Sequence, residues 1–304
     1  MRIVLNGQQA FGEAVLKALL DRGEEVVAVY CAPDAPGQRP DPLKAAAEAR
    51  GLPVVQPKSF KDPAVAEAFR TWKPDLAVMA YVTKIVPSSV LGIPALGTIQ
   101  YHPSLLPRHR GPCSINWPII QGETRTGLTV FWPDEGLDTG PILLQKEVAI
   151  GPDDTLGSLY FDRLFPMGVE AMLEAVDLVR AGTAPRIPQD EAQATYEGWC
   201  RAEDVRIDWS RPAASIYALI RGANPQPGAW TELHGKRVQV FETHRVPKGS
   251  GAEPGTVVSI DTDGMRVAAG DGDLLIERVR TSGSKAAAAE LVDLLGLAPG
   301  MRLG

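Results

Sequence analysis

The stretch RIVLNGQQAFGEAVLKALLDRGEEVVAVYCA, residues 2–32, decides the fold class. Residues 2–7 form an apolar run typical of a buried strand, and residues 24–32 form a second one. Between them, residues 12–23 carry apolar side chains at helical spacing and end on a glycine suited to cap a helix. A strand, a helix and another strand in this order predict one unit of a parallel sheet.

The same alternation continues along the next 70 residues or so. Apolar periodicity predicts two more helices and three more strands, namely helices over 41–51 and 62–74 and strands over 52–57, 75–80 and 97–102. The sequence therefore predicts an α/β fold with a doubly wound, mostly parallel sheet. Such sheets bind ligands beyond the carboxyl ends of their strands. We expect one site formed by the turn after Gly7, residues 80–87 and residues 102–111.

Residues beyond 125 predict additional strands and a second domain. Two strands over 126–133 and 141–150 resemble a hairpin joined by residues 134–140, and a long helical stretch covers 155–181. Further on, short alternating strands are predicted over 236–246, 255–264, 265–272 and 273–281. Short strands separated by turns favour a small OB-like β-barrel.

Composition indicates where the domains end and which partners the protein is expected to bind. Residues 182–198 are rich in Pro, Gly and polar residues, as a linker is. We place a first domain at 1–182, a linker at 183–200 and the OB-like domain at 201–304. Of the 304 residues, 44% are hydrophobic and 22% charged, which is typical of a globular protein. The net charge of −6 gives no electrostatic reason to expect nucleic acid as a partner, and it predicts no oligomeric state.

Several classes of site and location are disfavoured. The three cysteines are far apart in sequence, and the four histidines show no zinc-ligand spacing with them, so we expect no metal. The glycines at 7 and 12 do not complete a GxGxxG pattern, because Gln9 occupies its middle position; NAD is not expected. The apolar start is too short for a signal peptide, and no apolar run is long enough to span a membrane. We therefore expect a cytoplasmic protein.

One histidine stands at the end of a predicted strand. His102 follows the apolar run 97–101 in IQYHPSLLPRHRG, residues 99–111. A histidine there is often hydrogen-bonded scaffold, and the glycine-flanked segment DEGLDTG, residues 134–140, is often an ordinary turn. Together, however, they could bring Asp138 to His102. A carboxylate that orients an imidazole is a general acid–base pair.

These two segments resemble the formyltransferase fold family that uses 10-formyltetrahydrofolate. The shared pattern is HPSLLPRHRG followed by the aspartate of GLDTG, with SINW, FPMGVEAM, APRIPQ, ATYEG and PGAWTE elsewhere in the chain. The resemblance is strongest to the hydrolase domain of 10-formyltetrahydrofolate dehydrogenase, and methionyl-tRNA formyltransferase is similar over the whole chain. Since there is no room for that dehydrogenase's carrier-like and aldehyde dehydrogenase domains, a stand-alone module is implied.

The resemblance implies roles for individual residues. His102 matches the family's catalytic histidine and Asp138 its essential aspartate. Gln100 stands where the transferases have an asparagine that binds the formyl oxygen and where the dehydrogenase's hydrolase domain has an apolar residue. Lys84, Ile85 and Val86 match the loop whose backbone holds the pterin. The remaining folate contacts that the resemblance implies are Tyr81, Leu105, Asp134, Gly136 and Leu137.

The formyl acceptor is left open by the sequence, although one reading is favoured. Residues 201–304 hold 13 basic and 13 acidic residues, and residues 31–41 hold one Arg and two Asp, which disfavours a tRNA acceptor. Transfer to water, as in a formyltetrahydrofolate hydrolase, is our first expectation. A small amine or amino sugar comes next and Met-tRNA last. A catalytically silent folate-binding module would be expected to lack His102 or Asp138.

Overall fold

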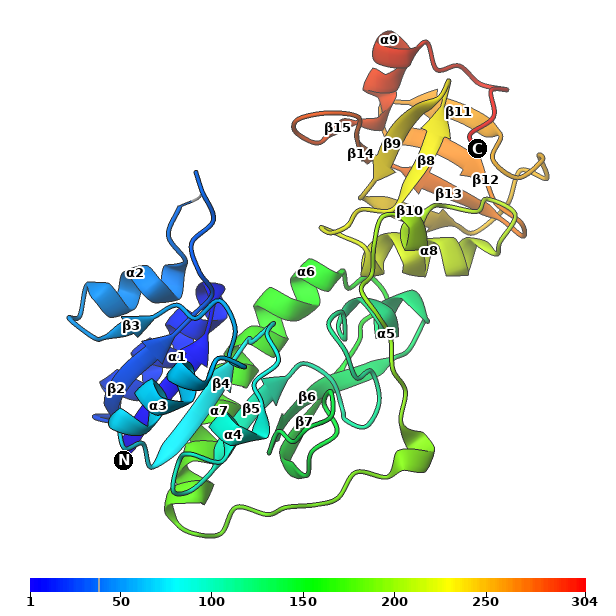
Figure 1. Ribbon diagram of the computed structural model, residues 1–304. Helices are drawn as coiled ribbons and strands as arrows, with labels where there is room; N and C mark the ends of the chain where they lie inside the picture. Colours follow the sequence, from blue (N-terminus) through cyan, green and yellow to red (C-terminus); the bar gives the residue numbers. More distant parts are fainter. Residues whose placement is uncertain (38) are drawn as a thin grey trace. The chain divides into compact units, whose positions relative to one another are not determined.

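The computed structural model describes residues 1–37 and 39–304, and the chain forms two compact units (Figure 1). The first unit comprises Met1–Ser114, Thr126–Val148 and Phe161–Glu197. The second unit comprises Ile115–Arg125, Ala149–Tyr160 and Gly198–Gly304.

A seven-stranded sheet forms the centre of the first unit, in the order β3-β2-β1-β4-β5-β6-β7. The strands are β1 (Arg2–Gly7), β2 (Glu25–Tyr30), β3 (Val54–Val55), β4 (Leu76–Ala80), β5 (Thr98–His102), β6 (Arg125–Phe131) and β7 (Ile142–Ala149). Strands β1 to β5 pair in parallel, whereas β5 and β6 pair antiparallel. The predicted doubly wound, mostly parallel sheet is confirmed.

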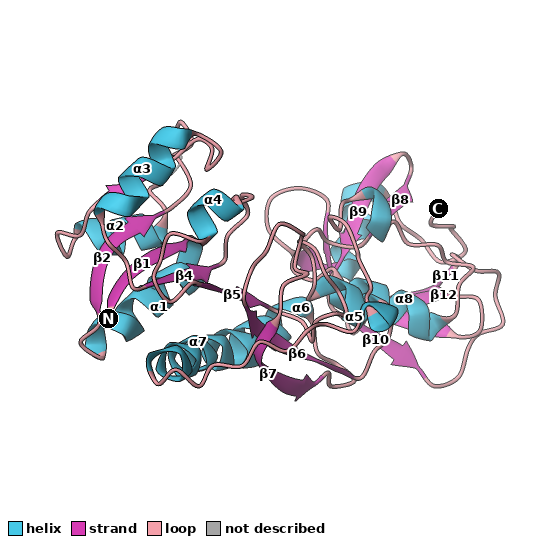
Figure 2. Cartoon of the chain, turned by 60° about the horizontal axis from the view of Figure 1, so that its bottom comes forward, coloured by secondary structure: helices cyan, strands magenta, loops and turns pink. Residues whose placement is uncertain are grey.

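Helices cover both faces of this sheet. They are α1 (Gln9–Asp21), α2 (Pro42–Glu48), α3 (Pro63–Thr71), α4 (Ser88–Leu91) and α7 (Phe165–Arg180). Helices α1, α2 and α7 contribute Leu16, Leu43 and Met172 to one apolar core, while α3 and α4 contribute Phe69 and Leu91 to the other. Figure 2 shows α3 and α4 on the opposite side of the sheet from α1 and α7. The two cores lie against the faces of the sheet, and the connecting loops lie at the carboxyl ends of the strands.

Helix α1 begins three residues earlier than its sequence pattern predicts. Gln8 precedes it and makes no side-chain capping hydrogen bond. Instead, both carboxylate oxygens of Asp41 accept from the backbone N–H of Gln9, at 2.9 Å each, and one of them also accepts from Leu43 at the start of α2. A side chain 32 residues away thus supplies the cap that the local sequence lacks.

We predict that Asp41→Ala destabilises the protein more than Asp62→Ala. Asp62 caps only α3, through Ala64 N–H. The loss of one cap costs about 1 kcal/mol, so the loss of caps on both α1 and α2 should cost about 2 kcal/mol. Urea unfolding of both variants measures the difference. Equal losses would contradict a shared role for Asp41.

The predicted long helix over 155–181 is interrupted. The chain forms α6 (Leu156–Leu159), then a π-helical turn (Tyr160–Leu164), and then α7. Pro166 lies in the first turn of α7, where it removes one backbone N–H and crowds the carbonyl four residues before it. This accounts for a widened turn at that point.

Two antiparallel four-stranded sheets form most of the second unit, in the orders β10-β13-β12-β11 and β15-β14-β9-β8. Their strands are β8 (Trp230–Leu233), β9 (Lys236–Val240), β10 (Thr243–Val246), β11 (Val257–Asp261), β12 (Gly264–Ala268), β13 (Asp273–Ile276), β14 (Arg278–Arg280) and β15 (Ala286–Ala287). Each predicted strand over 236–246 and 273–281 is in fact two short strands, because the chain crosses from one sheet to the other within it.

The helices of the second unit are α5 (Asn116–Ile120), α6, α8 (Ala213–Gly222) and α9 (Leu291–Leu295). Short 3-10 turns occur in the chain at Glu191–Gln193, Glu203–Val205 and Ala288–Glu290.

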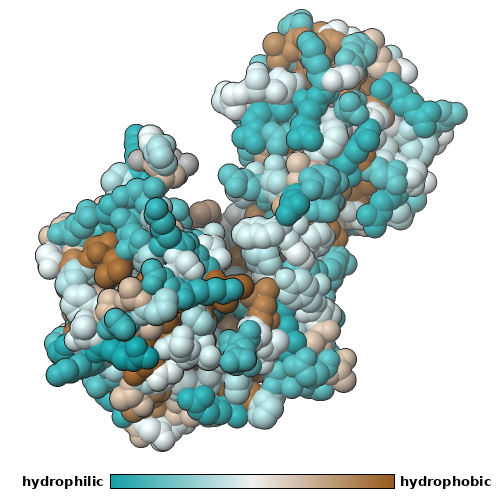
Figure 3. Space-filling model, viewed as in Figure 1, coloured by the Kyte–Doolittle hydropathy of each residue, from teal (hydrophilic) through white to brown (hydrophobic). Residues whose placement is uncertain are grey.

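In the part of the chain that the structure describes, no helix is both long and apolar enough to cross a membrane. On the face drawn in Figure 3, hydrophobic residues form small separate patches among hydrophilic ones.

Candidate active site

Strand β5 places two polar side chains on one face of the sheet. Ile99 and Tyr101 belong to the core beneath α1 and α7. Because side chains alternate along a strand, Gln100 and His102 share the opposite face. His102 is 5% exposed and Gln100 is half-buried. Within the described residues, no hydrogen bond is made to the Gln100 side-chain amide, which leaves its N–H groups available to a ligand.

The His102 ring is held by one backbone carbonyl. Its Nε2 lies 2.9 Å from the carbonyl oxygen of His109. A carbonyl only accepts, so Nε2 must carry a proton. The other nitrogen, Nδ1, lies 3.7 Å from Oδ2 of Asp138, which is within ion-pair range but longer than a hydrogen bond. Nδ1 is therefore the nitrogen that can exchange a proton, and a cation there faces a carboxylate.

Asp138 is buried and held in an unusual backbone conformation. It is 6% exposed and has φ of +58°, a region that costs a non-glycine residue energy unless its surroundings impose it. Its Oδ2 accepts from the backbone N–H of Gly111 at 2.9 Å. The predicted meeting of residues 102–111 with residues 134–140 is therefore present in the structure.

A single threonine secures the loop that follows His102. Thr129 lies opposite His102 on β6, and its hydroxyl donates to the carbonyl of Ser104 at 2.7 Å. The same oxygen accepts from Leu106 N–H at 3.1 Å and from the Gln145 amide at 2.9 Å. The Ser104 hydroxyl in turn donates to Arg108 O. These bonds fix the path of the loop toward His109, whose carbonyl binds His102.

The segment 134–140 is closed by its own polar groups. One carboxylate oxygen of Asp134 accepts from Gly136 N–H at 3.0 Å and from the Thr139 hydroxyl at 2.6 Å. At Gly140, a Cβ would lie 1.8 Å from the carbonyl oxygen of Trp132, so only glycine fits. The glycines that flank Asp138 in sequence therefore have steric reasons to be there.

The segment expected as a linker covers this site. Arg110 is buried and pairs with Glu191, whose carboxylate raises the pKa of the guanidinium above its usual value, while the arginine lowers that of Glu191. Buried His109 donates its backbone N–H to the Thr195 hydroxyl at 2.8 Å, and its Nδ1 is 3.2 Å from the Glu197 carboxylate. His109 and Arg110 thus hold the chain around the site.

The residues expected to contact folate lie in loops that follow three strands: residues 81–86 follow β4, Leu105 follows β5, and residues 134–137 follow β6, which is antiparallel to β5. Tyr81, Ile85 and Leu137 are 47%, 70% and 49% exposed, so their apolar surface is accessible to a ligand. Burial raises the pKa of the Tyr81 hydroxyl, and nearby Cys113 raises it further. The loops that carry Val86 and Asp134 are joined by a hydrogen bond from Ser88 to Glu135, at 3.1 Å.

The other expected folate contacts differ in their burial. Val86 is buried in the core beside α4, and half-buried Leu105 lies against Gly127. The Lys84 ammonium donates to the carbonyls of Pro57 and Lys58, at 2.8 and 3.1 Å. Gly136 is exposed at the tip of its loop. The structure therefore buries Val86, half-buries Leu105 and bonds the Lys84 ammonium to backbone carbonyls.

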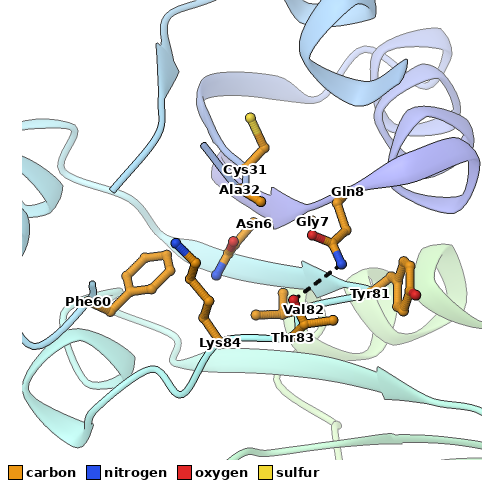
Figure 4. A pocket seen from close by; sticks show the side chains of 10 residues that line it. All are labelled: Asn6, Gly7, Gln8, Cys31, Ala32, Phe60, Tyr81, Val82, Thr83 and Lys84. Carbon is orange, nitrogen blue, oxygen red and sulfur yellow. Dashed lines mark hydrogen bonds between the residues drawn. The ribbon is translucent and has the colours of Figure 1, made fainter. Parts of the chain in front are cut away.

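A small hollow lies at the ends of β1, β2 and β4 (Figure 4). Its lining includes Asn6, Gln8, Phe60, Tyr81 and Lys84, and the Gln8 amide donates to the Thr83 hydroxyl at 3.3 Å. Asn6 is 6% exposed. The sequence analysis did not single it out, although its position at the end of a buried strand was a usable signal.

Residues 1–37 and 39–304 contain no group of three or more His, Cys, Asp or Glu that could hold a metal ion.

Sequence reasoning also missed Gly111, Thr129 and Gln189. Gly111 supplies a backbone N–H, which no side-chain pattern reveals. Thr129 lies on a strand where such residues are common, so nothing in the local sequence marks it. Gln189 ends the stretch APRIPQ, which carries part of the family resemblance and was the available signal, but the resemblance assigned it no role. Chemically, the site combines a histidine able to exchange a proton, a neighbouring carboxylate and an unpaired amide. This set of groups can remove a proton and stabilise an oxyanion.

The chain matches two family models. Residues 1–176 match the formyl transferase model, and residues 200–292 match the formyl transferase C-terminal domain model. The methionyl-tRNA formyltransferase of Geotalea daltonii is 44% identical over 290 residues, which cover 94% of this chain and 92% of that protein. The mitochondrial 10-formyltetrahydrofolate dehydrogenase of Mus musculus is 42% identical over 295 residues, which cover 91% of this chain and 31% of that protein.

Solved structures show the same fold at lower identity. HypX from Aquifex aeolicus in complex with tetrahydrofolic acid has a TM-score of 0.70 at 22% identity, over 96% of this chain and 47% of that one. An N-formyltransferase from Helicobacter canadensis has a TM-score of 0.70 at 17% identity, over 91% and 98% of the two chains. The two family matches and the 44% identity to the Geotalea daltonii protein show that the chain belongs to the formyl transferase family.

Proposed function

We propose that this protein takes the formyl group of 10-formyltetrahydrofolate and passes it to water, releasing formate and tetrahydrofolate. The observation that carries the proposal is the buried His102–Asp138 pair beside the unpaired amide of Gln100. In this proposal residues 1–182 carry out the chemistry. The backbone of residues 84–86 holds the pterin, and the exposed side chains of Tyr81 and Leu137 cover the bound folate.

The proposed reaction breaks the bond between N10 and the formyl carbon. Water attacks that carbon, and its proton passes to Asp138 directly or through a second water. The tetrahedral intermediate carries an oxyanion, which accepts hydrogen bonds from the Gln100 amide and from protonated Nδ1 of His102. His102 then delivers its proton to N10 as the bond to carbon breaks, so that tetrahydrofolate and formic acid leave. The acid gives up its proton to solvent as formate, and the proton held by Asp138 returns to Nδ1 of His102.

Water is favoured over a phosphate-bearing acceptor by the start of α1. In doubly wound folds the helix N-terminus after β1 is a natural phosphate site. Here the carboxylate of Asp41 occupies it through two hydrogen bonds to Gln9 N–H. In the neighbouring segment Lys44 pairs with Asp34 and Glu48. An anionic acceptor would therefore meet a carboxylate where its phosphate should bind.

Transfer to Met-tRNA is the second candidate, because the relative from Geotalea daltonii that carries this name matches 94% of the chain. The deciding experiment incubates the protein with 10-formyltetrahydrofolate alone and follows formate and tetrahydrofolate. Catalytic release without an acceptor is expected. Release that requires Met-tRNA, an amino sugar or a small amine would replace water with that acceptor, and binding without any turnover would indicate a silent folate-binding module.

We predict that Gln100→Leu lowers kcat about 10²-fold, since it removes one donor to the oxyanion. The KM for 10-formyltetrahydrofolate should change little, because the amide acts on the charge that develops during the reaction. Gln193→Leu, at an exposed site in the 3-10 turn Glu191–Gln193, is the matched control. An unchanged kcat in Gln100→Leu would show that this amide does not bind the oxyanion.

A further inference from the structure

Gln189 connects the two segments that hold the His102–Asp138 pair. Its amide nitrogen donates to the carbonyl of Asp138 at 2.9 Å and to that of Gly140 at 2.7 Å. Its amide oxygen accepts from Nε of Arg110 at 3.2 Å and from Nη2 at 2.8 Å. The side chain is half-buried, and all four bonds lie within the first unit. Both ends of the amide are therefore fully used.

The amide nitrogen of Gln189 donates to the backbone around Asp138, which has an unfavourable conformation that neighbouring residues must hold in place. Asp138 has φ of +58°, and its segment is short and largely exposed. Residues in such conformations persist only where their surroundings impose them. By holding the carbonyls of Asp138 and Gly140 together, Gln189 fixes the peptide groups on the carboxyl side of Asp138, and with them the direction of its carboxylate.

The amide oxygen of Gln189 accepts hydrogen bonds from Arg110, in the segment 109–111 that binds the Asp138 carboxylate. Arg110 lies between His109, whose carbonyl binds Nε2 of His102, and Gly111, whose N–H binds Oδ2 of Asp138. Arg110 is also held by both carboxylate oxygens of Glu191. Through Arg110, this one amide links the backbone groups that bind His102 and Asp138, namely the His109 carbonyl and the Gly111 N–H, to the backbone of residues 138–140.

We infer that Gln189 is a positioning residue that sets the geometry of the His102–Asp138 pair, and that its amide nitrogen is the part that does so. The inference rests on one part of the proposed function, namely that the His102–Asp138 pair performs the proton transfers. Gln189 need not touch folate or the acceptor. Its loss should therefore reduce turnover and leave folate binding intact.

Gln189→Glu in the full chain separates the two ends of the amide. The glutamate keeps the acceptor for Arg110, but it places oxygen against two carbonyl oxygens where the native residue donates. A misplacement of about 1 Å in a catalytic group can cost 10²-fold in rate, so kcat should fall by about this factor while the KM for 10-formyltetrahydrofolate stays unchanged. Gln193→Glu adds the same charge to the same segment at an exposed position and likewise removes an amide donor, here the bond from Gln193 to Asp190 at 2.7 Å, so its kcat should stay native.

A second variant, Gln189→Met, and crystal structures of both variants test the same role of Gln189. Gln189→Met, which removes the hydrogen bonds without adding charge, serves if the glutamate variant fails to fold, and it should show the same loss of kcat. If the native protein releases no formyl group, crystal structures of the variants decide. Displacement of the Asp138 carboxylate from Gly111 N–H and His102 would support the role of Gln189 and leave only the proposed function wrong. An undisturbed pair, or native kcat in the Gln189→Glu variant, would overturn the inference.

Discussion

His102→Ala is expected to reduce formate release from 10-formyltetrahydrofolate by about 10²–10⁴-fold, the usual contribution of a positioned general acid or base. Nδ1 of His102 is the only ring nitrogen left for the reaction, because Nε2 donates to the carbonyl of His109. Asp138→Asn should cause a loss of similar size. Its side-chain oxygen can still accept from Gly111 N–H, but the negative charge that stabilises a cation at Nδ1 is gone.

Three measurements test this pair together: kcat for formate release, the dissociation constant for 5-formyltetrahydrofolate, and the urea midpoint of unfolding. Only kcat is expected to change strongly. His244→Gln, at an exposed position in the second unit, is the matched control and should retain full activity. Full activity of His102→Ala or Asp138→Asn would show that the pair does not carry the reaction.

Gly140→Ala is expected to impair both stability and activity. A Cβ at this position would lie 1.8 Å from the carbonyl oxygen of Trp132 and 2.9 Å from its carbon, and backbone cannot move aside as a flexible side chain can. Overpacking of this kind typically costs about 1–3 kcal/mol, and this contact is at the severe end. Because Asp138 lies two residues earlier in the same closed segment, kcat should fall as well.

Gly198→Ala provides the control for this prediction. A Cβ there would meet no atom within 4 Å, so its effect on the free energy of unfolding should stay within about 0.5 kcal/mol. Urea unfolding and formate release, measured on both variants, give the comparison. If Gly140→Ala were as stable and as active as Gly198→Ala, the close packing of Gly140 against Trp132 would be wrong.

Much of the fold follows from short-range patterns. Apolar runs and helical spacing over residues 2–102 predict the strands and helices of the parallel sheet, and the strand order confirms that sheet. The placement of a ligand site at the strand ends stays a prediction. Boundaries were less well predicted where distant residues decide them. Helix α1 begins at Gln9 because Asp41 caps it, and two predicted strands of the second unit divide because the chain changes sheets.

By itself, the sequence determined the alternating architecture and the pair of segments that resemble the formyl transferase family, because both are patterns within continuous stretches of chain. Only the tertiary structure decided which nitrogen of His102 is free to react, that Gly111 holds Asp138, and that Gln189 joins both segments. These contacts link residues 7, 27 and 51 positions apart. They depend on backbone groups that every residue has, so side-chain patterns do not reveal them, and only folding brings their partners into range.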